Sequence, residues 1–263
     1  MRIKGLIIGI LTAMLLTSCV TEVRLAKQFV QESKQCRAAV YFPEEAQVTL
    51  IQADDGEYTK VLDSLDQNAF LDIVYAAYAE ELGRYGVEVY VPEDPEHIVV
   101  DTMQWLVILS KVEIQGLFTP YVDQLFDLID TYEYSFMLNT VNVAAWFDID
   151  DGQWQPTLFY EHNLRDDFRS RVSRSRENGI QYHYDIQTLT TDDIYNYAVF
   201  LGRRYADFTF NYMMNRYIQQ EMGRKNTFPR FKLRWDHREK SLDLMEEEEG
   251  FIEMKEEGEE EDG

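Results

Sequence analysis

The feature that most constrains the fold is a pair of long strand patterns near the middle of the chain. Met103–Gln115 begins with apolar residues at consecutive positions, which is typical of a strand covered on both faces. Glu133–Ile149 is a second long strand, and its apolar positions change parity midway, which predicts a β-bulge near Asn139–Asn142. Two strands of this length predict that a sheet forms the centre of the fold.

Shorter patterns before this pair predict two further strands and a helix. Ala46–Gln52 and Val87–Val91 are rich in the β-branched residues that favour strands. Apolar residues at spacings of three and four predict a helix that begins at a cap, Ser64 or Asp66, and ends near Arg84.

A long helix is expected near the C-terminus, over about Asp192–Met222. Thr190 or Thr191 is its N-cap, and two aspartates follow in the first turn, where negative charge is favourable. Gly202 in mid-helix costs about 1 kcal/mol in helix propensity, so we expect close packing against a neighbour there. The order of elements predicts an α+β fold, with helices packed on a mixed sheet of about five strands.

Several segments leave alternatives open. Pro120–Tyr132 fits a short helix or a loop, and Thr227–Trp235 fits an edge strand or an arm. Leu164–Gly179 is highly charged and fits a helix that ends at its glycine, whereas Ile180–Leu189 fits a strand. Asp151-Gly152 predicts a hairpin turn with a returning strand after it.

The extreme N-terminus has the pattern of a secretory signal. Arg2 and Lys4 flank the start of an apolar run, Gly5–Leu16, that is shorter than the about 20 residues needed to span a bilayer. The run ends in Leu16-Thr17-Ser18-Cys19, which resembles the lipobox of bacterial lipoproteins, whose cysteine thiolate takes a diacylglycerol. The resemblance implies a signal peptide at residues 1–18 and a further acyl chain, such as palmitate, on the amine of Cys19.

The lipobox also implies a location for the mature chain. Two or more acyl chains hold a protein stably at a membrane. Val20 stands where an aspartate retains lipoproteins at the inner membrane in the best-known sorting system, so the resemblance implies the outer membrane. Glu22 is the one acidic residue close to Cys19, so we favour the periplasmic face over the cell surface.

Length and charge limit the organisation and the partners. We expect a tether at residues 19–37, a single α+β domain at 38–240 and a disordered acidic tail at 241–263. The formal net charge of −23 excludes nucleic acid as a partner. Basic residues gather in the C-terminal third, so the acidic tail either masks this basic face or keeps the protein soluble.

Two further stretches, "FLDIVYAAYAEELGRYGVEVYV" and "YAVFLGRRYADFTFNYMMNRYIQ", join the lipobox and the early "VTLI" strand in a wider resemblance. Together they resemble a family of bacterial envelope lipoproteins whose folds are similar to the TolB N-terminal, LpoB and CsgG-like α/β modules. The resemblance covers about Val40–Gln220 as an order of elements. The resemblance implies that the protein binds other proteins in envelope assembly or maintenance, and it implies no catalytic activity.

No catalytic or cofactor motif is recognisable in the sequence. His97, His162, His183 and His237 stand in no metal-binding spacing, and Cys36 is a lone thiol that we expect to be buried and unreactive. The sequence has no G-x-S-x-G elbow, P-loop or G-x-G-x-x-G turn. We therefore expect a protein that is not an enzyme and that needs no metal and no cofactor.

The aromatic residues suggest a different kind of site. Trp105 and Trp146 lie inside predicted strands and are expected in the core. Asp148–Trp154 holds three carboxylates and a glycine, but their spacing fails the EF-hand pattern, so a hairpin turn is favoured over a calcium loop. Trp154 beside this turn is the best candidate for an exposed ring that stacks on a sugar.

The arginine-rich segment is a second candidate binding site. It contains Arg169, Arg171, Arg174 and Arg176; as a strand it would have one basic face, and as a helix its charge would surround the axis. Such a group can bind phosphates of lipopolysaccharide or an acidic partner surface. A solvated charged loop fits the same residues.

The sequence therefore predicts a membrane-anchored, non-enzymatic accessory lipoprotein that acts through a protein partner in the cell envelope. The alternative is a carbohydrate-binding lipoprotein of a polysaccharide-uptake system. Exposed aromatic rings beside a pocket would favour this alternative, and buried rings would count against it.

Overall fold

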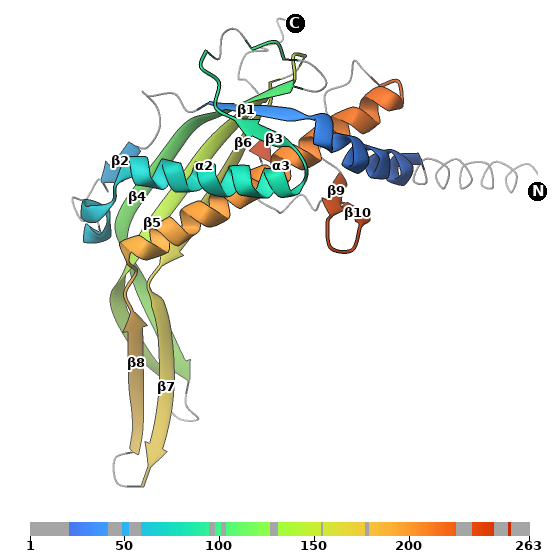
Figure 1. Cartoon of the computed structure of the whole chain (residues 1–263). Helices are drawn as coiled ribbons and strands as arrows, with labels where there is room; N and C mark the ends of the chain where they lie inside the picture. Colours follow the sequence, from blue (N-terminus) through green and yellow to red (C-terminus); the bar gives the residue numbers. More distant parts are fainter. Residues whose placement is uncertain are drawn as a thin grey trace, which may run out of the picture.

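A computed structural model describes ten stretches of the chain, and its helices and strands form an α+β fold (Figure 1). The described stretches are residues 21–41, 49–52, 59–94, 98–100, 104–126, 131–153, 155–176, 179–224, 233–244 and 252–253. In chain order the elements are a helix at 21–32, η1 (Ser33–Gln35), β1 (Arg37–Tyr41), β2 (Thr49–Gln52), η2 (Lys60–Ser64), α2 (Gln67–Arg84), β3 (Glu88–Tyr90), β4 (Gln104–Phe126), β5 (Thr131–Asp150), β6 (Thr157–Arg165), β7 (Asp167–Ser175), β8 (Gly179–Gln187), α3 (Thr191–Glu221), β9 (Leu233–Asp236), β10 (Ser241–Leu244) and β11 (Ile252–Glu253).

One mixed sheet forms the centre of the molecule. Its strand order is β11-β6-β5-β4-β1-β3, and β2 pairs with a further part of β4. β1 runs parallel to β3 and β4, whereas β5 and β6 continue the sheet in antiparallel pairs. The predicted α+β class, the mixed sheet and the central position of the two long strands are confirmed. The predicted strand at Ala46–Gln52 is β2, and the described sheet gains the short strands β1 and β11.

The two long helices begin at the capping residues that the sequence indicates. The Asp66 carboxylate accepts hydrogen bonds from the backbone N–H groups of Asn68 and Ala69 at the start of α2. At the start of α3, Thr190 and Asp193 form a reciprocal capping box. Both predicted helices are therefore confirmed to within a few residues at each end.

Helices α2 and α3 lie side by side across one face of the sheet (Figure 1). Gly202 permits this approach, because a Cβ atom there would collide with the Val74 carbonyl oxygen and lie 2.9 Å from Ala77 Cβ. The predicted close packing at the mid-helix glycine is confirmed, and its neighbour is the backbone of α2.

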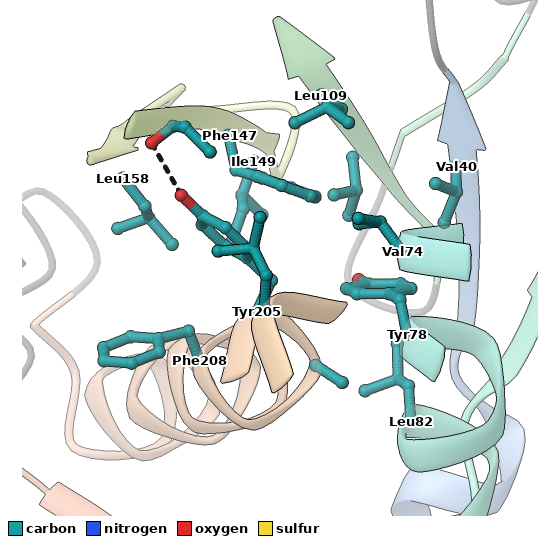
Figure 2. Packing of buried hydrophobic residues seen from close by; sticks show 14 of the residues in the cluster. Val40, Val74, Tyr78, Leu82, Leu109, Phe147, Ile149, Leu158, Tyr205 and Phe208 are labelled. Atoms are coloured by element: carbon teal, nitrogen blue, oxygen red, sulfur yellow. Dashed lines mark hydrogen bonds between the residues drawn. The ribbon is translucent and has the colours of Figure 1, made fainter. Parts of the chain in front are cut away.

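The core lies between these helices and the sheet, and aromatic rings fill much of it (Figure 2). Tyr205 stacks on Phe147 with ring centroids 3.6 Å apart, and its hydroxyl donates a hydrogen bond to the Ala145 carbonyl at 2.7 Å. Tyr78 from α2 donates to the Thr209 hydroxyl at 3.0 Å. Buried tyrosines thus link each helix to its neighbour, and each of these two hydroxyls is satisfied.

The expected tether at residues 19–37 is wrong over the part that the structure describes. Residues 21–32 are helical, and Arg37 already belongs to β1. Leu25 and Phe29 are buried one turn apart, and the Phe29 ring lies 5.3 Å from that of Phe210 in α3. Two apolar residues one turn apart are only a weak sequence signal for a helix. They suffice to anchor a helix here because they pack against the aromatic face of α3.

The segment Pro120–Tyr132, expected as a short helix or a loop, is a strand where the structure describes it. β4 continues to Phe126, and Pro120 pairs with Met137 within the β4–β5 ladder. The predicted bulge near Asn139–Asn142 is also wrong, because the β4–β5 register is continuous there and shifts instead between Leu109 and Lys111.

The C-terminal region is more ordered than the predicted disordered tail at 241–263. Thr227–Trp235 was expected to form an edge strand or an arm, and its described end belongs to β9, which pairs with β10. β11 pairs with β6. The hairpin of β9 and β10 packs on α3 through the buried Trp235. The backbone N–H of Trp235 donates a hydrogen bond to Asn211 Oδ1 at 2.8 Å. Residues 245–251 and 254–263 lie outside the described part of the chain.

His237, in the turn between β9 and β10, is expected to make the attachment of this hairpin sensitive to pH. Its ring stacks on Tyr85 with centroids 3.8 Å apart, and Phe210 lies on another side at 4.9 Å. Burial lowers the pKa of His237, although the carboxylates of Glu81 and Asp236 oppose this shift. The unfolded chain therefore takes up the proton at a higher pH than the folded chain does.

The free energy of unfolding is thus expected to fall as the pH drops through the ordinary histidine range, about 6.5, toward the lower folded-state pKa of His237. His237→Phe keeps a ring on Tyr85 and should remove this part of the pH dependence. Urea denaturation of both proteins at about pH 7.5 and about pH 5 measures the difference. Equal slopes with pH for the two proteins would show that His237 does not titrate in this way.

Candidate functional site

The most distinctive surface of the molecule is a projecting arm of four strand segments. Beyond the last residues that pair with β2 and β6, the β4–β5 ladder continues through residues 117–126 and 131–139. The β7–β8 hairpin extends from the body in the same direction (Figure 1). We call these two ribbons together the β-arm.

Aromatic side chains join the two ribbons of the β-arm. Phe136 of β5 lies 4.8 Å from Phe168 of β7 and 5.3 Å from Tyr121 of β4, measured between ring centroids. Tyr184 of β8 completes the cluster, 5.7 Å from Phe168. Edge and offset ring contacts of this kind contribute about 0.5–1.5 kcal/mol each beyond their burial. The hairpin is therefore packed against the β4–β5 ribbon.

This cluster also explains the parity change that the sequence shows in β5. Val141 and Phe147 point to the face that α2 and α3 cover, whereas Phe136 points to the opposite face, toward β7 and β8. The register of β5 with β4 is continuous here, but the layer that covers β5 lies on one face of the sheet at Val141 and Phe147 and on the other face at Phe136. A change of partner, and not a bulge, produces the change of apolar phase.

Four large apolar side chains of the β-arm are exposed to solvent. Val122 and Met137 lie on the face opposite to the aromatic cluster, and Met137 retains 51% of its accessible surface. Val172 and Ile186 share the aromatic face of the hairpin, and Val172 retains 53%. An exposed apolar surface on a projecting element is typical of a site that contacts another molecule.

The predicted arginine cluster lies on this arm, but the strand divides it. Arg169 and Arg171 stand on the outer face of β7, opposite Asp185 and His183 of β8. Arg174 belongs to the other face, opposite Ile180, and Arg176 lies beyond the end of the strand. The expected helix over this segment is wrong, the expected strand at Ile180–Leu189 is confirmed as β8, and no single face collects all four arginines.

A buried carboxylate holds the base of the β-arm. Asp166, between β6 and β7, accepts hydrogen bonds from the Asn139 backbone N–H at 2.8 Å, the Asn139 side-chain amide at 2.9 Å and the Leu189 N–H at 2.6 Å. Asn139 Oδ1 in turn accepts from the Thr59 hydroxyl at 2.9 Å. This network joins the base of the β-arm to η2 and to the segment just before α3.

Asp166→Ala should therefore loosen the arm. It leaves the buried N–H groups of Asn139 and Leu189 without their acceptor, at a cost of about 3 kcal/mol in unfolding free energy. Urea denaturation measures that loss, and tryptic cleavage within β7 under native conditions should become faster. Asp167→Ala removes the exposed neighbouring carboxylate and is expected to change stability by less than about 0.5 kcal/mol. Equal effects of the two substitutions would contradict the role of Asp166.

The predicted hairpin turn at Asp148–Trp154 is confirmed in its described part, and it carries an ion pair that sequence reasoning missed. Asp150 accepts from the Gly152 N–H at 2.7 Å, and Gly152 has a φ of +77°. The Asp151 carboxylate pairs with the guanidinium of Arg216 from α3, and both side chains are almost completely buried, at 2% and 1% exposure. Tyr212 also donates to this carboxylate, at 3.1 Å.

The other predicted residues have mixed outcomes. Trp105 is buried in the core, as expected, whereas Trp146 is half-buried on the open face of the sheet, beside Phe159 and under the Lys111 ammonium. Cys36 is a free and buried thiol, as expected, and burial raises its pKa to about 11. Cys19 and Trp154 lie outside the described residues, and so does His97.

The remaining histidines do not converge. His162 stacks on Tyr197, His183 contacts the Ser173 hydroxyl on the β-arm, and His237 lies in the turn between β9 and β10, where it stacks on Tyr85. Among the described residues, no group of three or more His, Cys, Asp or Glu side chains is placed to hold a metal ion. No described helix is long and apolar enough to cross a membrane.

Comparisons with known proteins add no family. No family model matches the chain, and no curated protein matches it at a significant level.

Proposed function

We propose that this chain is a lipid-anchored accessory protein of the bacterial cell envelope that is not an enzyme and acts by binding a protein partner through the β-arm. The observation that carries the proposal is the arm itself, which projects from the body of the molecule (Figure 1) and carries four exposed large apolar side chains. The lipobox at Cys19 supplies the expected attachment to the outer membrane, at its periplasmic face.

The construction of the arm supports a binding role. The aromatic cluster and the Asp166 network hold both ribbons in a defined position, so little conformational entropy would be lost when a partner binds. Met137 belongs to the β4–β5 ribbon and Val172 to the β7–β8 hairpin, so a partner that buries both side chains must contact both ribbons. The arginines add charge around these apolar residues, as the polar rim of an interface does.

The glycan-binding alternative receives little support from the two tryptophans Trp105 and Trp146. Stacking on a sugar needs an uncovered aromatic face. Trp105 is buried, and the Lys111 ammonium lies over the Trp146 ring at 4.7 Å from its centroid. The proposal for a protein partner therefore takes precedence, and glycan binding at Trp154 stays the alternative.

Site-specific photocrosslinking in cells tests the proposed function. A photoreactive residue at Met137 or at Val172 should crosslink to the same envelope protein, whereas one at Val99, which is exposed but off the arm, should not. Val172→Asp should reduce the crosslink from position 137 by at least about tenfold, because a charge opposes burial of that surface. Capture of different proteins from the two arm positions, or equal capture from position 99, would contradict the proposal.

The lipid anchor is tested separately. Cys19→Ala should abolish incorporation of an alkyne-labelled palmitate and release the chain from the membrane fraction, and it should also remove the arm crosslinks. Retention of label in this variant would show that acylation occurs elsewhere. Binding of envelope polysaccharide by the purified chain, with no arm crosslink in cells, would favour the glycan alternative.

A further inference from the structure

A second surface lies at the edge of the sheet, away from the β-arm, and its aromatic rings are partly uncovered. Tyr160 and His162 of β6 point toward α3, where His162 stacks on Tyr197 at 5.4 Å and Tyr160 lies 6.3 Å from Phe200. Phe200 lies 5.7 Å from Tyr197 and is 46% exposed. These four rings form a strip along the outer side of β6, which we call the edge strip.

The backbone beside the edge strip is available for pairing. β6 is bound on one side by β5 along its whole length, but on the other side β11 pairs only with Leu158 and Phe159. The stretch Glu161–Arg165 has no second strand partner among the described residues. An unpaired strand edge beside apolar side chains is the geometry at which an extended peptide adds to a sheet.

The chain's own C-terminal segment shows what kind of strand this edge accepts. β11 pairs antiparallel to β6, with Ile252 opposite Phe159 and Glu253 opposite Leu158. It comes from a stretch in which Phe251, Ile252 and Met254 stand among many glutamates. Arg165 at the far end of β6 supplies positive charge that complements such a segment, whereas Glu161 at the near end favours an apolar or uncharged residue beside it.

One buried polar atom also indicates that the edge strip is incomplete. Among the residues that the structure describes, the hydroxyl of Tyr197 has no hydrogen-bond partner, and the residue is only 6% exposed. An unsatisfied buried hydroxyl is unfavourable by about 1–3 kcal/mol. The Tyr197 ring stacks on that of His162, which is exposed on β6, and a polar group of a bound segment that reaches this hydroxyl would remove the deficit.

We propose that the edge strip is a strand-addition site for an extended segment of a partner protein that alternates apolar and acidic residues. The segment pairs antiparallel with β6 from Leu158 to Arg165, places an apolar side chain over Phe200, and displaces β11. β11 then competes with the partner segment for the same edge of β6, so a partner binds only if its affinity is high enough to displace β11. This site is independent of the β-arm, so either proposal can fail without the other.

The test uses the full chain and a fluorescein-labelled synthetic peptide with the sequence of residues 248–256, measured by fluorescence anisotropy. Ile252→Pro disables pairing of the chain's own β11, and it should bind the peptide at least about tenfold more tightly than the unaltered chain does. Adding Phe200→Asp should weaken this binding by at least about tenfold. Adding Val172→Asp instead, on the exposed surface of the β-arm, should leave it unchanged.

Hydrogen–deuterium exchange locates the bound peptide. Amides in Glu161–Arg165 should exchange at least about tenfold more slowly with the peptide bound to the Ile252→Pro chain. Absence of binding to this chain, no response to Phe200→Asp, or protection confined to the β-arm would each overturn the proposal. Binding of a soluble glucan that depends on Phe200 and is unaffected by the peptide would overturn it as well, because it would assign the strip to a saccharide.

Discussion

Replacing Arg216 by methionine is expected to lower the free energy of unfolding by about 4 kcal/mol, the largest loss that we expect from a single substitution in this chain. Asp151 and Arg216 are both almost completely buried, and their charges neutralise each other. Methionine fills much of the same volume but removes the guanidinium, so the Asp151 carboxylate is left in the interior without its counter-charge. Thermal denaturation should show a fall of about 10 °C in Tm.

Two further variants separate the ion pair from a loss of packing. The double substitution Asp151→Ala with Arg216→Met removes both charges and should be less destabilising than the sum of the single changes, by about 2 kcal/mol. Arg169→Ala breaks an ion pair of 3.4 Å between exposed side chains and should change stability by less than about 0.5 kcal/mol. Strict additivity in the double variant would show that the two charges are not coupled.

The second large effect is expected at Gly202, where alanine should destabilise the protein by about 3 kcal/mol. Alanine improves helix propensity by about 1 kcal/mol, but its Cβ atom would collide with the Val74 carbonyl oxygen and with Ala77 of α2. Because the obstacle is backbone, the two helices must separate. Urea denaturation of the purified variant measures the loss.

Gly83 in α2 is the matched control for this prediction. It is also a helical glycine, and a Cβ atom there would meet nothing within 4 Å. Gly83→Ala should therefore stabilise the chain, by about 0.5–1 kcal/mol, because it reduces the entropy of the unfolded state. If both glycine substitutions stabilise the protein, the close approach of α2 and α3 at Gly202 is not tight enough to matter.

Local patterns were sufficient for the elements that depend on local interactions. The caps at Asp66 and Thr190 and the turn at Gly152 all follow from residues within a few positions of each other. Capping and turn preferences act through neighbouring backbone groups, so the sequence contains the whole signal.

Local patterns failed where a distant layer decides which face is covered. Residues 21–32 look like a tether until α3 receives Phe29, and the parity change in β5 looks like a bulge until β7 places Phe168 over Phe136. The arginine-rich segment fits helix, strand or loop by charge alone. Its partner strand β8 follows it directly, but the aromatic contacts that hold the hairpin come from β4 and β5.

The sequence by itself therefore determined the α+β class, the two long helices, the central strand pair and the lone buried thiol. Only the tertiary structure revealed the β-arm, the edge strip and the pair of Asp151 with Arg216, which stand 65 residues apart. The physical reason is that burial and charge pairing are properties of neighbours in space. The periodicity of apolar residues can be read along the sequence. Which face of an element is covered depends on segments that are distant in the sequence and pack against it in the fold.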